Sequence, residues 1–482
     1  MPKTTKPEEQ KRWRENIEAL TVAVMVALLF KYFVLEISKI PSGSMQPTLM
    51  GHAGTGVFDR VLVDKFSFCF RDPDRYEIVV FKHPLERSRV MVKRLVGMPD
   101  EQLKIEHGDL WTRASESDEW QVLRPPGSVQ SELWKRIDVN KPQQSSWSSS
   151  EGSVWVAKRR EARTNDPGYI TFRARDNGVR NEYTHGYPDS LRKEIDAERR
   201  RTSGLQGRGF VGDLRVEGDV EPAAAVTAFT VLLQEGPRLY EFRIPGPASD
   251  ASSKAEIRYH VRNGSSDVMD RIEIAESGRL AKAKSYSFSA QNLNDRLTLE
   301  LDGDVLAEID IPANENQHTV LQLGFEGGGG ELQDLQVYRD TFYSAPLPNG
   351  APWIVTIPAE NYVMLGDNTL DSADSRLWEE QTITLAGLGP RSGNYRNREN
   401  PLPGVGDYRN LVRFKDTYGE VDWFPRETIE SESGLRLEGL LSELGAIERE
   451  PLVSRNLILG RAVAIFWPIR PTERLWRLAW LH

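Results

Sequence analysis

One stretch decides the fold of this chain: Ile40-Pro41-Ser42-Gly43-Ser44-Met45-Gln46-Pro47-Thr48-Leu49, which follows an apolar segment near the N-terminus. Two serines flank a glycine, and a proline stands on each side of them. Proline fixes φ and resists helix, whereas Gly43 permits a tight or left-handed backbone. We therefore expect a stiff loop that displays its hydroxyl groups at a defined place. Alone, the stretch favours an ordinary polar turn, and only the motifs downstream overturn that interpretation.

Two further stretches lie downstream of this loop. They are Met91-Val92-Lys93-Arg94-Leu95-Val96-Gly97-Met98-Pro99 and Gly366-Asp367-Asn368-Thr369-Leu370-Asp371-Ser372-Ala373-Asp374-Ser375-Arg376. In this order after an apolar segment, the three stretches resemble those of the type I signal peptidases (leader peptidases), which are membrane-anchored serine proteases with a Ser/Lys dyad. The resemblance covers residues 15–111, 350–378 and 454–470, and it implies an antiparallel β-sheet catalytic domain.

The resemblance also implies roles for individual residues. Ser44 would be the nucleophile and Lys93 the general base, while the Ser42 hydroxyl and the Ser44 backbone N–H would form the oxyanion hole. The supporting residues would be Ser372, which orients the lysine, the ion pair of Asp374 and Arg376, and Asp367 with Asn368, which hold the turn. Thr369 departs from the arginine that is usual at this place, so one supporting contact stays open.

Elementary chemistry gives Lys93 the same role. A serine hydroxyl is a poor nucleophile at neutral pH, and a lysine can serve as its base only when its amine is neutral. Burial in apolar surroundings lowers a lysine pKa. On an extended strand Met91, Lys93 and Leu95 share one face, while Arg94 points the other way and stays charged. The competing interpretation is an exposed strand lysine, which the flanking motifs argue against.

Substrate binding is expected along the strand that precedes Lys93. An extended peptide would add to the edge at Val90, Met91 and Val92. Shallow pockets lined by Ile40, Pro41, Met45, Leu49 and Met91 would accept small side chains, which fits the Ala-x-Ala pattern that the resemblance implies before the cut. This chemistry needs no metal and no organic cofactor.

Composition limits the other functions. The chain has 482 residues, 39% of them hydrophobic and 28% charged, which predicts two to four folded units. Its net charge of −9 argues against nucleic-acid binding. The single cysteine, Cys69, excludes an intrachain disulfide and a cysteine-based metal site. The seven histidines show no spacing typical of metal ligands.

The apolar segment predicts a membrane anchor. Residues 17–37 are expected to form a transmembrane helix, because the nineteen mostly apolar residues 17–35 span about 28 Å as a helix, close to one hydrocarbon core. Five basic residues precede it, so the N-terminus is expected in the cytoplasm of a bacterium and the catalytic domain on the outer or periplasmic side. A cleavable signal peptide is the alternative, but no Ala-x-Ala site follows the segment.

The remaining sequence predicts insertions in the catalytic domain. Short alternating strands between Gly204 and Ser344, with an Asp-Gly turn, indicate a β-sandwich similar to concanavalin-like jelly rolls. We expect it to hang from a surface loop, so that its removal leaves the dyad folded.

The predicted boundaries, for a mainly β chain, are 1–16 (cytoplasmic), 17–37 (membrane), 38–111, 345–378 and 454–470 (catalytic domain), 112–203 (irregular insertion), 204–344 (jelly roll), 379–453 (second insertion, with a helix over 432–448) and 471–482 (tail).

The functional prediction is therefore a membrane-bound serine endopeptidase that removes signal peptides from exported preproteins, with the lipid bilayer and possible contact with the secretion translocon as partners. A self-cleaving repressor-type Ser/Lys protease is a related alternative, although such proteins lack a membrane segment. A further alternative is a catalytically silent, membrane-tethered protein whose jelly roll binds glycans or envelope partners. Retention of Ser42, Ser44, Lys93 and Ser372 together argues against a silent protein.

Overall fold

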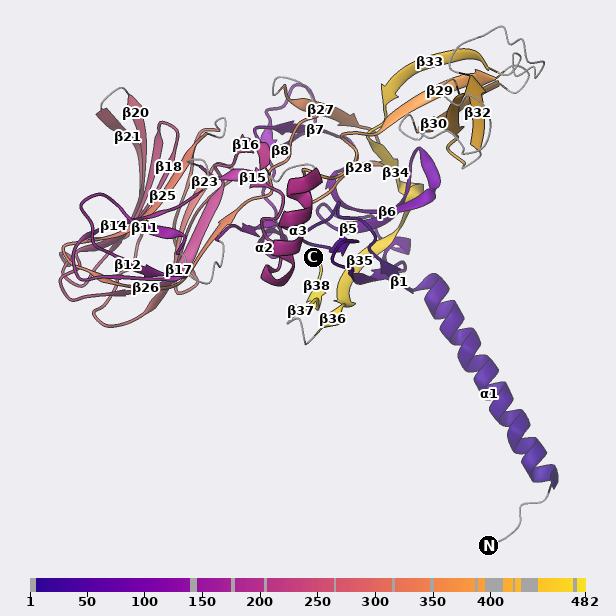
Figure 1. Ribbon diagram of the computed structural model, residues 1–482, viewed down its shortest axis with the longest axis horizontal. Helices are drawn as coiled ribbons and strands as arrows, with labels where there is room; N and C mark the ends of the chain where they lie inside the picture. Colours follow the sequence, from indigo (N-terminus) through magenta and orange to yellow (C-terminus); the bar gives the residue numbers. More distant parts are fainter. Residues whose placement is uncertain are drawn as a thin grey trace.

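The computed structural model describes residues 6–138, 145–174, 178–202, 206–263, 266–313, 317–346, 351–385, 389–394, 411–418, 421–425, 441–470 and 475–482. The chain is mainly β, as the sequence predicts. Figure 1 shows a central body that carries the three sequence motifs, a large β-sandwich at one side, a smaller group of strands at the other, and a single projecting helix.

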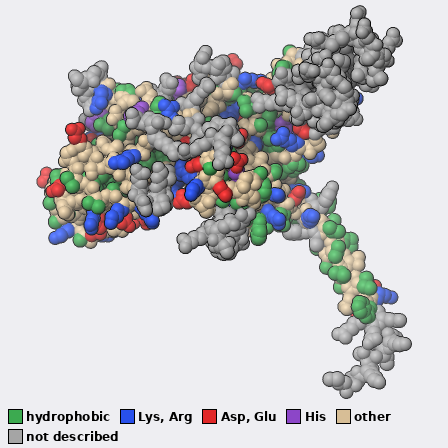
Figure 2. Space-filling model, in the orientation of Figure 1, with side chains coloured by type: hydrophobic (Ala, Val, Ile, Leu, Met, Phe, Trp, Pro, Cys, Tyr) green, Lys and Arg blue, Asp and Glu red, His purple; other side chains and the backbone are tan. Residues whose placement is uncertain are grey.

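The projecting helix is α1 (Lys6–Phe33). Hydrophobic side chains lie along its surface (Figure 2), and Leu20, Leu28 and Phe33 are each more than half exposed. The helix begins within the charged N-terminal stretch and carries Lys31 in its last turn. Across the described residues, no helix combines the length and the apolar character that crossing a membrane requires, so the prediction of a spanning helix over 17–37 is not supported.

The sheet that carries the three sequence motifs is antiparallel and draws on three distant parts of the chain. Its strand order is β1 (Leu35–Lys39), β4 (Arg60–Asp64), β35 (Ile458–Trp467), β5 (Ile78–His83), β6 (Glu86–Gly97), β28 (Asn361–Leu365) and β34 (Leu452–Ser454), with β38 (Ala479–Trp480) paired to β35. Strands from residues 35–97, 361–365 and 452–467 thus meet in one sheet, which brings the three motifs together.

Residues 112–203 and 204–344 together form the first insertion. Its chain leaves and returns on one small sheet. Its strands are, in order, β27 (Trp353–Ile357), β7 (Glu101–Glu106), β8 (Asp109–Arg113) and β9 (Gln121–Val122). Strand β7 pairs with β8 on one edge and with β27 on the other, so the two ends of the insertion lie two strands apart.

The insertion folds into a β-sandwich. One sheet has the order β12 (Val156–Lys158), β13 (Glu161–Thr164), β26 (Gly330–Arg339), β17 (Leu214–Pro222), β22 (Tyr286–Leu293), β23 (Arg296–Leu301) and β24 (Asp304–Asp310), with β10 (Lys135–Arg136) paired to β26. The other has the order β11 (Trp147–Ser149), β14 (Gly168–Phe172), β25 (Thr319–Glu326), β18 (Ala228–Glu235), β19 (Arg238–Pro245), β20 (Glu256–Asn263) and β21 (Ser266–Ile274). Alternate residues of β17 are buried, so one face of that sheet packs on a core that includes Phe229, Phe288 and Phe325.

The sandwich takes strands from a stretch where the sequence predicts irregular loops. Residues 112–203 supply β10 to β14, and also α2 (Gly127–Leu133), β15 (Arg180–Glu182), which pairs with β16 (Gln206–Phe210), and α3 (Asp189–Thr202). These strands have two to five residues, which is too short for alternation to show in a polar sequence. Trp147, Trp155 and Phe172 anchor them in the shared core.

The second insertion is also β. It contains a sheet of β30 (Gly389–Asn394), β29 (Glu379–Leu385) and β33 (Leu441–Arg449), and a pair of β31 (Leu411–Lys415) and β32 (Val421–Pro425). The helix predicted over 432–448 is wrong from 441 onward, because pairing with β29 overrides the local helix propensity. Residues 432–440 lie outside the described part. The short elements are β2 (Gly51–His52), β3 (Val57–Phe58), η1 (Ser67–Cys69), η6 (Arg455–Leu457), β36 (Ile469–Arg470) and β37 (Leu475–Trp476).

Candidate active site

Strand β6 and the loop after β1 bring Lys93 and Ser44 together. The Lys93 Nζ atom lies 2.5 Å from the Ser44 Oγ atom and 3.1 Å from the Val92 carbonyl oxygen. The lysine is only 1% exposed, while Ser44 is partly exposed. A hydroxyl that solvent can reach therefore stands beside an amine that solvent cannot reach.

The environment of Lys93 disfavours its charge. Burial lowers the pKa of Lys93 to about 8, and Arg89 adds to this effect, while Asp374 and Asp367 partly oppose it. An ordinary lysine titrates near 10.4, so a much larger fraction of Lys93 is neutral at neutral pH. A neutral amine in contact with a serine hydroxyl is the arrangement that a general base requires.

The neighbouring Arg94 points away from this pair, as the strand period predicts. Its guanidinium is fully buried and contacts the Asp367 carboxylate through Nε at 2.9 Å and Nη2 at 2.8 Å, with Glu132 at 3.0 Å from Nη2. These carboxylates raise the pKa of Arg94 despite its burial, and the charge and hydrogen bonds of Arg94 in turn lower the pKa of Asp367. Arg94 thus stays charged and fixes Asp367.

Hydrogen bonds hold the Ser44 loop against the turn that begins at Gly366. The Asn368 backbone N–H donates to the Ser44 carbonyl oxygen at 3.1 Å, and its side-chain amide donates to the Gly43 carbonyl oxygen at 2.9 Å. The Thr48 hydroxyl donates to Asp367 at 2.6 Å. Two loops more than 300 residues apart in sequence are thereby fixed to each other.

The other predicted site residues lie around this junction. The Ser42 Oγ atom is 3.4 Å from the Ser44 Oγ atom. Arg376 makes two contacts to the buried Asp374 carboxylate, at 2.8 and 2.7 Å, and the Gly366 N–H donates to Asp374 at 3.0 Å. Ser372 is buried, and a Cβ placed on Gly366 would lie 2.1 Å from the Ser372 Oγ atom, so this contact requires glycine at position 366. No hydrogen bond joins Ser372 to Lys93, both of which the structure describes.

The residues predicted to bind substrate lie along the same edge and in the core beneath it. Strand β28 pairs with β6 only at residues 94–97, so Val90, Met91 and Val92 have β5 alone as a partner strand among the described pairings. Val90 is 54% exposed, and Pro41 is exposed. Ile40, Met45 and Leu49 are buried in a core that also contains Val80, whereas Met91 belongs to the core on the other face.

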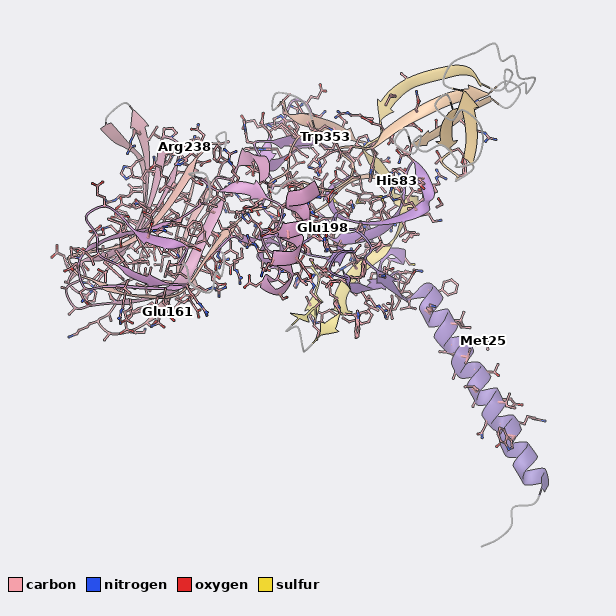
Figure 3. The ribbon with its side chains drawn as sticks, in the orientation of Figure 1. Met25, His83, Glu161, Glu198, Arg238 and Trp353 are labelled. Atoms are coloured by element: carbon pink, nitrogen blue, oxygen red, sulfur yellow. The ribbon has the colours of Figure 1, made fainter. Side chains whose placement is uncertain are left out.

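Several contacts to the Ser44 loop and to the turn that begins at Gly366 come from the first insertion. The sequence did not predict these contacts. The Lys135 Nζ atom of β10 donates to the Asp367 carbonyl oxygen at 2.5 Å, and burial lowers the pKa of Lys135 to about 7. On α3, Glu198, labelled in Figure 3, lies with its Oε2 atom 3.2 Å from His52 Nε2. The sequence that makes these contacts is polar and irregular, and its residues show no spacing that would predict them.

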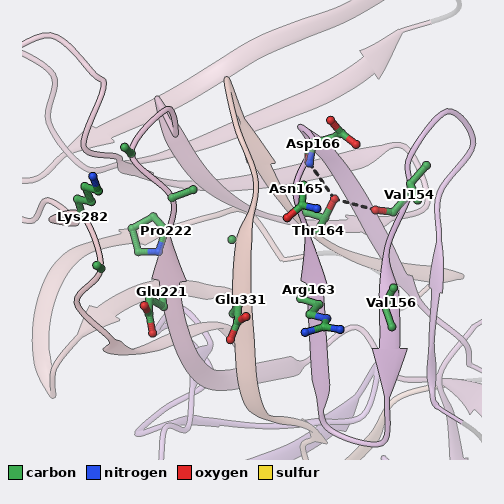
Figure 4. Close-up of a pocket in the computed structure, with 14 residues that line it drawn as sticks. Val154, Val156, Arg163, Thr164, Asn165, Asp166, Glu221, Pro222, Lys282 and Glu331 are labelled. Atoms are coloured by element: carbon green, nitrogen blue, oxygen red, sulfur yellow. Dashed lines mark hydrogen bonds between the residues drawn. The ribbon is translucent and has the colours of Figure 1, made fainter.

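A separate hollow of about 710 Å³ lies on the sandwich (Figure 4). Val156, Arg163, Glu331 and Glu221 form a row across four strands along it, and Lys282 faces them from a loop. None of its lining residues belongs to the Ser44 loop or to β6. Within the described part of the chain, no group of three or more His, Cys, Asp or Glu side chains could hold a metal ion.

Comparison with known sequences finds one family model and several curated proteins that are similar to part of this chain. Residues 13–179 match the family model described as signal peptidase, peptidase S26. Similar curated proteins include a probable signal peptidase I-2 of Synechocystis (32% identity, 26% of this chain, 57% of the relative) and a probable signal peptidase I-1 of the same organism (36%, 23% and 58%). Signal peptidase I of Leptolyngbya laminosa is 32% identical over 26% of this chain and 62% of the relative. The chain thus spans about three fifths of the length of these relatives.

Solved structures are similar to this chain only distantly. A carbohydrate-binding module of Bacillus subtilis has a TM-score of 0.24 at 10% identity, with 40% of this chain and 94% of that chain covered. A Xenopus laevis galectin has a TM-score of 0.21 at 14% identity, with coverages of 26% and 89%. Similarity at this level says nothing about the ligands of this chain.

Proposed function

We propose that this chain, for which the family-model match and the relatives support a type I signal peptidase family, is a serine endopeptidase that removes N-terminal signal peptides from exported preproteins. One observation carries the proposal: a lysine that is 1% exposed, with its pKa lowered to about 8, has its amine 2.5 Å from the Ser44 hydroxyl.

In the proposed mechanism, the Ser44 Oγ atom attacks the carbonyl carbon of the scissile peptide bond while the neutral Lys93 amine takes its proton. The Ser44 backbone N–H and the Ser42 hydroxyl donate to the oxyanion. Protonated Lys93 then gives the proton to the leaving amine, and the C–N bond breaks. Water, activated by the same lysine, hydrolyses the acyl-enzyme. Ser372, Asp374, Arg376 and Asp367 are proposed to support the pair.

The substrate is proposed to bind as an added strand at the open edge of β6. Its residues before the cut would pair with Val90, Met91 and Val92, and small side chains would face Ile40, Pro41, Met45 and Leu49. Three of these four residues are buried in the core and expose almost no surface, so pockets floored by them would be shallow. Shallow pockets would favour small residues such as those of Ala-x-Ala.

The chain is proposed to act at a bacterial membrane. The apolar residues of α1 project away from the catalytic body (Figures 1 and 2). Phe66 and Phe70, 49% and 74% exposed, flank η1 on a catalytic domain whose first strand follows α1 directly. Aromatic side chains favour the interface between lipid and water, so this surface suits membrane association.

Cleavage of a model preprotein by the purified, detergent-solubilised protein tests the proposed function. The expected result is release of the signal peptide after the small-x-small site by the wild-type protein and none by Ser44→Ala. Turnover by Ser44→Ala at the wild-type rate would exclude the assignment of the nucleophile, and an inactive wild type would favour a silent binding protein.

A second candidate function concerns the sandwich, which would bind a glycan through the hollow of Figure 4. Glu221 lies directly opposite Glu331 on the adjacent strand, and Arg163 lies opposite Glu331 on its other side, so three charged side chains stand in a row along the hollow. Carboxylates beside Arg163 and Lys282 offer acceptors and donors for sugar hydroxyls. Calorimetric titration with soluble oligosaccharides should give binding that Arg163→Ala removes; no heat with any of them would reject this role.

A further inference from the structure

Gln46, two residues after Ser44, is held by the first insertion. Its side chain is 1% exposed, and its amide Nε2 atom donates to the Gly51 carbonyl oxygen at 3.1 Å. Its Oε1 atom lies 2.6 Å from the Tyr187 hydroxyl and 3.3 Å from the Tyr183 hydroxyl. Both tyrosines belong to the inserted chain. The Ser44 loop therefore has an anchor outside the catalytic domain.

The turn on the other side of Ser44 is held in the same way. Lys135 donates to the Asp367 carbonyl oxygen at 2.5 Å, and the Asn181 amide donates to the Thr369 hydroxyl at 3.0 Å. The residue between these two, Asn368, donates to the Ser44 and Gly43 carbonyl oxygens. The insertion thus contacts both segments whose mutual fit places Ser44 beside Lys93.

This contact is a packed core as well as a set of hydrogen bonds. Met50 and Val57, which follow the Ser44 loop, form one buried cluster with Tyr183, Tyr187, Leu191 and Ile195 of the insertion. Tyr187 is 4% exposed, and burial raises its pKa well above the ordinary value, so its hydroxyl remains a donor. An insertion that shares a core with the nucleophile loop is not a module that hangs from a surface loop.

We propose that Tyr187 is a positioning residue for Ser44, acting through Gln46, and that the first insertion is part of the support of the catalytic pair. This inference rests on the proposed peptidase function. It replaces the expectation that residues 204–344 are removable, since their deletion would also remove β25 and β26, the partner strands of β10, β13 and β14.

Tyr187→Phe removes the hydroxyl alone, and Tyr240→Phe is its matched control. Tyr240 is also fully buried in the insertion, but its hydroxyl donates to Glu235 at 2.9 Å, in the sandwich. With a small peptide substrate, we expect Tyr187→Phe to lower kcat roughly tenfold, the effect of one net hydrogen bond, with KM unchanged. Tyr240→Phe should lower the melting temperature and leave kcat unchanged.

A double variant separates a positioning role of Tyr187 from general destabilisation. In Gln46→Leu, which removes the acceptor, adding Tyr187→Phe should produce no further loss of kcat, because the two residues act through one contact. A kcat of Tyr187→Phe within twofold of wild type, or equal losses for Tyr187→Phe and Tyr240→Phe, would overturn the inference while wild-type cleavage stands. Absence of Ser44-dependent cleavage by the wild type would instead overturn the proposed function, and this inference with it.

Discussion

Two buried lysines of this molecule differ in the group that each amine faces. Lys93 on β6 is 1% exposed and Lys135 on β10 is 4% exposed, and burial lowers their pKa values to about 8 and about 7. The Lys93 amine faces the Ser44 hydroxyl at 2.5 Å, whereas the Lys135 amine faces the Asp367 carbonyl oxygen at the same distance. A carbonyl has no proton to give. Burial therefore prepares a lysine to act as a base, and the neighbouring group decides whether it can.

The largest expected effect comes from removing the lysine that faces the hydroxyl. Lys93→Met should reduce kcat for a model preprotein by about 10⁴-fold, at the upper end of what a general base contributes. The protein should stay folded, because methionine fills a similar buried volume. Steady-state cleavage assays with circular dichroism check both points. Cleavage within tenfold of wild type would mean that Lys93 is not the base.

Ser42→Ala tests the proposed oxyanion hole. It removes one proposed donor to the oxyanion, so kcat should fall by about 10²- to 10³-fold. KM should change little, since the donor acts on charge that develops only in the transition state. Wild-type rates for Ser42→Ala in the same cleavage assay would show that backbone groups alone form the oxyanion hole.

The second lysine should give a smaller effect of a different kind. Lys135→Met leaves the Asp367 carbonyl oxygen without this donor and should lower kcat by about tenfold, with a loss of stability of about 1–3 kcal/mol. Lys82→Met, at an exposed position of the neighbouring strand β5, is the matched control and should change neither quantity. Urea unfolding and cleavage assays measure both. If Lys135→Met abolished activity as completely as Lys93→Met, the distinction between the two lysines would be wrong.

The local chemistry of the pair could be predicted from sequence, because it depends on a motif and on the period of one strand. Alternation along β6 correctly separates Lys93 from Arg94, and the mainly β architecture follows from the short alternating strands. The support from the first insertion could not be predicted. Gln46 and Tyr187 are 141 residues apart in sequence, and neither belongs to a pattern that indicates their contact.

Thr369 shows how such a long-range contact alters a motif. The resemblance to signal peptidases expects an arginine there, and the sequence gives no reason for the change. In the folded chain the Thr369 hydroxyl accepts a hydrogen bond from Asn181 of the insertion, and the residue is 8% exposed. A short side chain at this position fits the packed contact between the turn and the insertion.

The pH dependence of kcat/KM tests the central claim most directly. Because the pKa of Lys93 is lowered, its neutral form prevails above about pH 8, so kcat/KM should rise with unit slope below that pH and level off above it. Lys135→Met should show the same midpoint at a lower plateau. A profile that still rises with unit slope through pH 10, near the ordinary lysine pKa, would contradict the account, and so would a midpoint that disappears in Lys135→Met.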